Sequence, residues 1–85
     1  MKLDEQTLRL IAIGASITAN CQPCLQTNVT KALECGVDEQ EIAEAIEVGK
    51  RVRKGAATKM DEFAMSLNHP ALASGGVAIS RCDCG

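Results

Sequence analysis

Apolar residues recur with helical spacing over most of the chain and predict three helices. In the first, Asp4 is the expected N-cap, and the stretch from Leu8 to Ile17 is apolar on nearly every face. Such a helix needs cover on all sides, which in a short chain indicates neighbours from other subunits as well as its own. The second helix is expected to begin between Asn20 and Gln22. It should end near Gly36, which suits a left-handed C-terminal cap.

The third helix is expected to be long and to end at residues 68–70. Asp38 and Glu41 form an acidic variant of the capping box in front of it. One heptad position carries small or apolar residues, namely Ile42, Gly49, Ala56 and Phe63. Gly49 and Gly55 each cost about 1 kcal/mol relative to alanine inside a helix, so they mark close helix crossings or a break near Gly55.

These patterns predict an all-α protein with one helical domain over residues 1–67 and a flexible tail over 68–85. The start of the chain is charged and no apolar run reaches bilayer length, so we expect a cytoplasmic protein without a membrane partner. An aromatic content of 1% and a net charge of -2 argue against a nucleic-acid partner. Five cysteines in a reducing compartment favour catalysis or metal binding over structural disulfides.

The segment Cys21-Gln22-Pro23-Cys24 carries the most specific chemistry. Two residues between the cysteines on a first helical turn bring the sulfurs within disulfide reach. The helix N-terminus offers unpaired N–H groups and positive potential, which favour thiolate over thiol and make a better nucleophile. We therefore expect a redox-active pair, with Cys21 the more exposed member. The alternative is a metal-binding module for zinc or an iron–sulfur cluster, with these two cysteines and the tail pair Cys82 and Cys84 as ligands.

The surrounding residues resemble a known family. Residues 19–25 (ANCQPCL), followed by 31–37 (KALECGV) and 38–46, are similar to the carboxymuconolactone decarboxylase family, and more narrowly to its alkylhydroperoxidase-like branch. The resemblance covers about residues 8–67. It implies an all-helical hairpin bundle that assembles as a homo-oligomer. It also implies thiol–disulfide oxidoreductase or peroxidase activity at Cys21 and Cys24.

Two positions depart from the pattern of that branch. Its peroxidase motif has a His four residues after the second Cys, where this chain has Asn28, and its proton-relay Glu falls on Arg9. An amide can hydrogen-bond a thiolate but cannot carry a proton near neutral pH. Glu5, one turn before Arg9, and His69 are the candidate proton carriers, while Asn28 is expected to orient the second sulfur. The departures lower the expected rate of hydroperoxide reduction and leave disulfide exchange intact.

Several other residues can be interpreted either as structural or as functional. Cys35 is expected to pack at a helix end. Cys82 and Cys84 form a candidate redox relay, if the tail carries electrons between the first pair and a partner. A basic run is either a solvated helix face or a docking patch for an acidic redox partner: Lys50, Arg51, Arg53 and Lys54. Arg9 is expected to pair with a buried carboxylate or to extend toward solvent at an interface.

The function expected from the sequence is thiol–disulfide exchange, with weak hydroperoxide reduction as a second activity. Cys21 attacks and Cys24 resolves, or the two roles are reversed. No organic cofactor is expected because the chain has no Gly-rich phosphate loop. Electrons then come from a separate thiol or protein reductant, and the substrate is a disulfide or a hydroperoxide. An oligomer in which the cysteines have no redox role is the third possibility.

Overall fold

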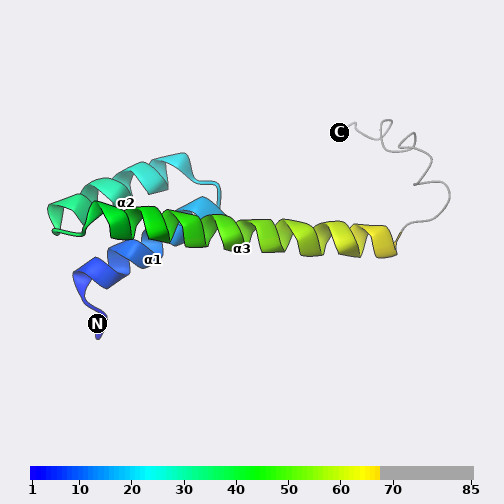
Figure 1. Cartoon of the computed structure of the whole chain (residues 1–85), viewed down its shortest axis with the longest axis horizontal. Coiled ribbons are helices and arrows are strands. Elements are labelled where there is room, and N and C mark those ends of the chain that lie inside the picture. Colours follow the sequence, from blue (N-terminus) through cyan, green and yellow to red (C-terminus); the bar gives the residue numbers. More distant parts are fainter. Residues whose placement is uncertain (68–85) are drawn as a thin grey trace.

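The computed structural model describes residues 1–67, and all regular structure in that range is helical, as predicted. The helices are α1 (Glu5–Thr18), α2 (Gln22–Glu34) and α3 (Glu39–Ser66) (Figure 1). Short turns connect them, and the second half of α3 projects beyond the other two helices. The predicted tail, with His69, Cys82 and Cys84, lies outside the described residues. In residues 1–67, no helix combines the length and the apolar character needed to cross a membrane.

The helices begin and end at residues suited to those positions. Asp4 is the N-cap of α1, as predicted, and its carboxylate accepts a hydrogen bond of 2.7 Å from the backbone N–H of Thr7. That hydrogen bond lowers the pKa of the Asp4 carboxyl, so its capping contribution is present above the ordinary carboxyl pKa and is lost as the pH falls through the lowered value. At the end of α2, Gly36 has a φ of 85°, which confirms the predicted left-handed residue.

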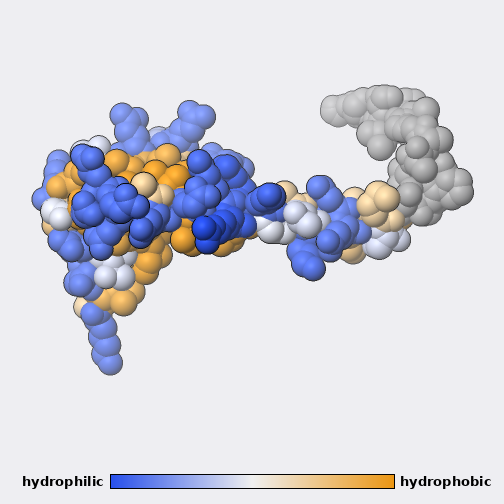
Figure 2. Space-filling view, in the orientation of Figure 1, coloured by the Kyte–Doolittle hydropathy of each residue, from blue (hydrophilic) through white to orange (hydrophobic). Residues whose placement is uncertain are grey.

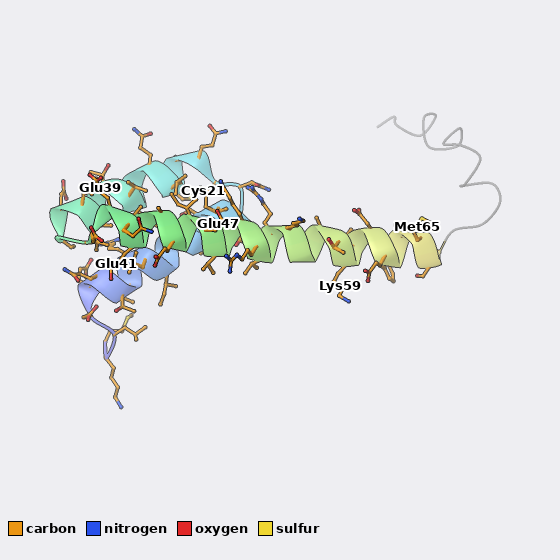
Figure 3. The ribbon with its side chains drawn as sticks, viewed as in Figure 1. Cys21, Glu39, Glu41, Glu47, Lys59 and Met65 are labelled. Atoms are coloured by element: carbon orange, nitrogen blue, oxygen red, sulfur yellow. A yellow bond between two sulfur atoms is a disulfide. The ribbon has the colours of Figure 1, made fainter. Side chains whose placement is uncertain are left out.

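The capping box predicted for α3 is wrong. Asp38 does stand at the N-cap, but its side chain makes no capping hydrogen bond. Glu39 and Glu41 instead lie in the first turn of α3 (Figure 3), where negative charge interacts favourably with the helix dipole. The start of α3 therefore depends on charge rather than on the reciprocal hydrogen bonds that the sequence suggested.

The core is small and centres on α1, which packs against both other helices, whereas α2 and α3 touch little. Among residues 1–67, four apolar residues are buried: Ile13, Ala32, Val37 and Ile42. Apolar surface is visible where the three helices meet, and the projecting half of α3 has a mixed surface (Figure 2). Because α1 provides the common contact, the positions of α2 and α3 relative to each other are set through it.

Helices α1 and α3 cross with their backbones almost in contact at Gly14 and Gly49. A Cβ atom on Gly49 would lie 2.5 Å from the carbonyl oxygen of Gly14 and 2.8 Å from Cβ of Ile17, closer than real atoms approach. The hydroxyl of Thr18 donates to the carbonyl oxygen of Gly49 at 3.3 Å across the same crossing. The predicted close crossing is thus confirmed at Gly49. The break suggested at Gly55 is wrong, since α3 is continuous there and a Cβ on Gly55 would meet nothing within 4 Å.

The two glycines of α3 give a matched test of this crossing. We expect Gly49→Ala to destabilise the fold by about 1–3 kcal/mol, because the added methyl group forces the helices apart. Gly55→Ala should instead stabilise it by up to about 1 kcal/mol, because alanine favours the helix and has free space there. Urea unfolding followed by circular dichroism measures both. Equal stabilisation by the two substitutions would contradict the close crossing.

Candidate functional site

Cys21 stands at the junction of α1 and α2 and belongs to the ends of both helices. Its backbone N–H donates to the carbonyl oxygen of Ser16 at 3.0 Å, and that of Asn20 donates to Ile17 at 3.1 Å, the two bonds of a Schellman motif that ends α1. Asn20 has a φ of 56°, a left-handed conformation that asparagine tolerates better than most residues. Cys21 is at the same time the N-cap of α2. Its position is therefore fixed by the turn as well as by the helix that follows.

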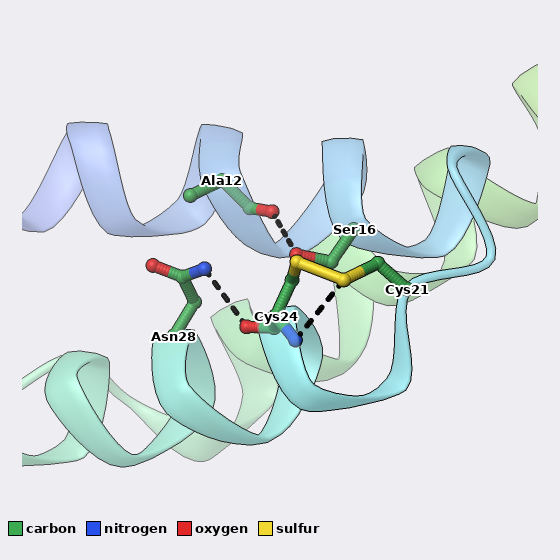
Figure 4. Close-up of a disulfide and its surroundings, with 5 residues drawn as sticks. All are labelled: Ala12, Ser16, Cys21, Cys24 and Asn28. Atoms are coloured by element: carbon green, nitrogen blue, oxygen red, sulfur yellow. Dashed lines mark hydrogen bonds between the residues drawn. A yellow bond between two sulfur atoms is a disulfide. The ribbon is translucent and has the colours of Figure 1, made fainter.

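Cys21 and Cys24 form a disulfide on the first turn of α2, with their Cα atoms 5.3 Å apart (Figure 4). The backbone N–H of Cys24 donates to Sγ of Cys21 at 3.3 Å, so the sulfur accepts a hydrogen bond that the helix cannot satisfy internally. Pro23 lies within the same turn, where its missing N–H costs nothing. The predicted pairing at a helix N-terminus is present in the structure.

The relative exposure of the two cysteines is the reverse of what the sequence suggested. Cys21 is half-buried, while Cys24 is exposed. The reason is the tight turn, because Cys21 lies only three residues after the end of α1 and its backbone N–H bonds back to Ser16 of that helix. Cys24 lies most of a turn further along α2, on a part of the helix that is open to solvent.

Asn28, Arg9 and Glu5 form a chain of polar contacts that ends at Cys24. The Asn28 amide donates from Nδ2 to the backbone oxygen of Cys24 at 2.8 Å, and its Oδ1 accepts from Nη1 of Arg9 at 3.2 Å. Nε of Arg9 in turn lies 2.7 Å from Oε2 of Glu5, whose side chain is half exposed rather than buried. Arg9 and Asn28, the two residues that differ from the family pattern, therefore contact each other, and Arg9 also contacts the predicted proton carrier Glu5.

This chain of contacts favours positioning over proton transfer. A guanidinium stays protonated in proteins, and an amide does not exchange a proton near neutral pH, so neither Arg9 nor Asn28 can pass a proton from Glu5 toward the sulfurs. Asn28 contacts Cys24 through its backbone oxygen, and the chain ties α1 to the first turns of α2. A proton relay through Glu5 stays a prediction.

A cavity of about 170 Å³ opens beside Cys21. Residues from all three helices and from the turn line it, namely Ser16, Ile17, Asn20, Cys21, Gln22, Leu25 and Arg53. Nη1 of Arg53 donates to Oδ1 of Asn20 at 2.9 Å and to the backbone oxygen of Ile17 at 3.3 Å. Arg53 therefore braces the turn before Cys21 and brings a positive charge to the cavity wall.

Sequence reasoning missed Asn20 and Arg53 as site residues. Asn20 was expected near the start of the second helix, but asparagine is also a common left-handed residue just after the end of a helix, so a local signal was available. Arg53 gave no such signal, because its sequence neighbours in α3 are also basic. Lys50, Arg51 and Lys54 are exposed and do not line the cavity. A docking role for the basic run stays a prediction.

The other cysteines lie apart from this site or outside the described residues. Cys35 is a half-buried free cysteine at the C-cap of α2, as the helix-end reading suggested. It lies eleven positions after Cys24, a distance of roughly 16 Å along a helix. Among residues 1–67 there is no group of three or more potential metal ligands. Cys82 and Cys84, for which metal and relay roles were suggested, lie outside this range. So does His69, the other candidate proton carrier.

The fold and the site together define a small helical protein with a disulfide-forming pair at a helix N-terminus. The profile of the carboxymuconolactone decarboxylase family matches residues 1–65, and the chain belongs to this family.

A relative in Paracoccus denitrificans, described as "Uncharacterized protein 4 in cox locus", is 36% identical over 55 residues. The match covers 65% of this chain and 50% of the relative, so the chain spans about half the length of that protein. None of the solved structures gives a significant match.

Proposed function

We propose that the protein is a thiol–disulfide oxidoreductase of the alkylhydroperoxidase-like branch of its family. The observation that carries the proposal is the position of Cys21, whose sulfur is bonded to Cys24 and accepts a helix N-terminal N–H, and which lines a cavity of about 170 Å³. The same positive end of α2 favours thiolate over thiol when the pair is reduced. A reversible disulfide needs both properties, a reactive sulfur and access to it.

The reaction runs in two exchange steps. In the reduced protein the Cys21 thiolate attacks one sulfur of a substrate disulfide, forms a mixed disulfide and releases the first substrate thiolate. The Cys24 thiolate then attacks the Cys21 sulfur, which restores the Cys21–Cys24 bond and releases the second substrate thiolate. Two electrons pass from the protein dithiol to the substrate. A separate thiol or protein reductant returns the protein to the dithiol by the reverse steps.

Cys21 is assigned the attack because the cavity leads to it. A substrate held there meets Cys21 first, and the exposed Cys24 is free to approach the mixed disulfide from the solvent side. The polar chain from Glu5 to Asn28 holds the backbone of Cys24 during these steps. Reduction of hydroperoxides also requires a proton for the leaving alkoxide. Because Arg9 and Asn28 cannot supply it, we propose that this activity is weak.

Serine substitutions test the exchange function. Cys21→Ser should abolish reduction of a small disulfide, because no nucleophile then faces the cavity. Cys24→Ser should trap the mixed disulfide at Cys21, which is visible as an added substrate mass. Cys35→Ser is the matched control and should keep full turnover, since Cys35 lies at the other end of α2. Turnover is followed as released thiol, and hydroperoxide consumption is assayed in parallel.

Below pH 7 the reduced protein should also be alkylated faster at Cys21 than at Cys35. Unchanged turnover in Cys21→Ser, or equal alkylation of these two cysteines, would rule out the exchange function.

We also propose that the protein associates with copies of itself through an apolar groove between α1 and α3. The groove has a volume of about 460 Å³ and is lined by Leu10, Ile11, Gly14, Ala15, Thr18, Ala45, Val48, Gly49 and Val52. Beyond it, the projecting half of α3 carries exposed apolar side chains of its own, including Met60 and Phe63. Met65 lies near the end of the same helix (Figure 3) and is also exposed. A second copy supplies both an apolar helix for the groove and a groove for that helix, so that each covers the other's exposed residues.

Sedimentation equilibrium tests this association. The native protein should sediment as a multiple of 9.0 kDa, and Ile11→Glu should shift it to the monomer, because Ile11 is 55% exposed and lines the groove. Leu33→Glu is the matched control, since Leu33 is 48% exposed but lies on α2 away from the groove. A native protein of 9.0 kDa would refute the proposal.

A further inference from the structure

Arg53 is a cation at the cavity wall that has no charged partner in the described part of the chain. The ion pairs of residues 1–67 join Arg9 to Glu5 and Lys59 to Glu62, and none includes Arg53. Nη1 of Arg53 is used by the turn, where it donates to Ile17 and Asn20. Nε and Nη2 donate to no group within residues 1–67. The guanidinium is thus anchored on one side and has N–H donors left for a ligand.

The cavity that Arg53 lines contains one other chemically reactive group, Cys21. The remaining lining residues are uncharged, so Arg53 supplies the only formal charge on this wall. Guanidinium groups bind carboxylates through paired N–H donors, and a ligand in so small a cavity would lie near both the cation and the sulfur. The volume of about 170 Å³ suits one arm of a small disulfide rather than a bulky group.

We propose that this cavity selects disulfides whose arms carry a carboxylate, with Arg53 binding the carboxylate while Cys21 attacks the nearby sulfur. The inference rests on the proposed exchange function and adds the class of its substrate. Cys21 forms a bond to the sulfur of the arm that Arg53 holds as the substrate S–S bond breaks, and the other arm leaves as a thiolate. Cys24 then completes the exchange, with two electrons transferred in all. Arg53 is a binding and specificity residue and takes no part in the bond changes.

Three small disulfides of similar size and different charge test the selection. Dithiodipropionate carries carboxylates, hydroxyethyl disulfide is neutral and cystamine carries amines. With the reduced native protein, the rate constant should be highest for dithiodipropionate and lowest for cystamine. Arg53→Gln should lower the ratio of the dithiodipropionate rate to the hydroxyethyl disulfide rate by roughly two- to fivefold, as expected for an exposed ion pair. High salt should reduce the native preference toward the ratio seen in the variant.

Arg51→Gln is the matched control because it removes the same charge from the same helix at a residue outside the cavity. It should leave the ratio unchanged. The neutral disulfide reports separately on the bracing role of Arg53, since loss of the Asn20 contact would slow all three reactions together. An equal loss for all three disulfides in Arg53→Gln, or an equal drop of the ratio in Arg51→Gln, would overturn the proposal.

A binding measurement separates this inference from the exchange function itself. 3-(Methylthio)propionate carries the carboxylate and a sulfur but cannot exchange. In an NMR titration of the oxidised protein, it should shift the backbone amides of Asn20 and Cys21 and the side-chain Nε–H of Arg53. Arg53→Gln should remove the shifts at Asn20 and Cys21, and Arg51→Gln should keep them. Absence of these shifts in the native protein would overturn the inference even if exchange is observed, and their presence would support it even if exchange is absent.

Discussion

The backbone contact between Gly14 and Gly49 is the constraint on which the rest of the structure depends. Only hydrogen in place of a side chain allows α1 and α3 to approach so closely. Arg53 follows Gly49 by one helical turn and therefore lies on the same face of α3. The close crossing brings that face to the end of α1, where Arg53 reaches Ile17 and Asn20. The cavity beside Cys21 exists because a crossing of small residues places a long basic side chain at the turn.

Three residues at the junction of α1 and α2 each have more than one structural role. Asn20 ends α1 in a left-handed conformation, and Cys21 both completes that ending and caps α2. Cys24 returns a backbone N–H to the Cys21 sulfur. Because the two helices share this junction, the sulfur pair is held by α1 and α3 as well as by its own helix. A small core is enough to support such a site when the reactive residues sit where the helices meet.

The fold could be predicted from local signals, whereas the site could be predicted only in part. Helical spacing, Asp4 and Gly36 specify the three helices through interactions within a few residues of each other. The Cys21–Cys24 pair could also be predicted locally, because the two cysteines are three positions apart on one helical turn. Three features of the site depend on how the helices cross. They are the partial burial of Cys21, the hydrogen bond from Arg53 to Asn20, and the polar contacts that link Glu5 to Asn28 through Arg9. No pattern along a single helix carries that information. The capping box at Asp38 failed for the opposite reason, since a plausible local pattern was not realised as a hydrogen bond.

The central claim is that Cys21 and Cys24 form the reversible disulfide of this protein. The most direct measurement is the intact mass after alkylation of free thiols, taken on the reduced protein and again after one equivalent of diamide. We expect two fewer of the five cysteines to be alkylated after oxidation, and peptide mapping should place the new bond between Cys21 and Cys24. Purified protein in which a metal protects Cys21, Cys24, Cys82 and Cys84 together from alkylation would contradict it.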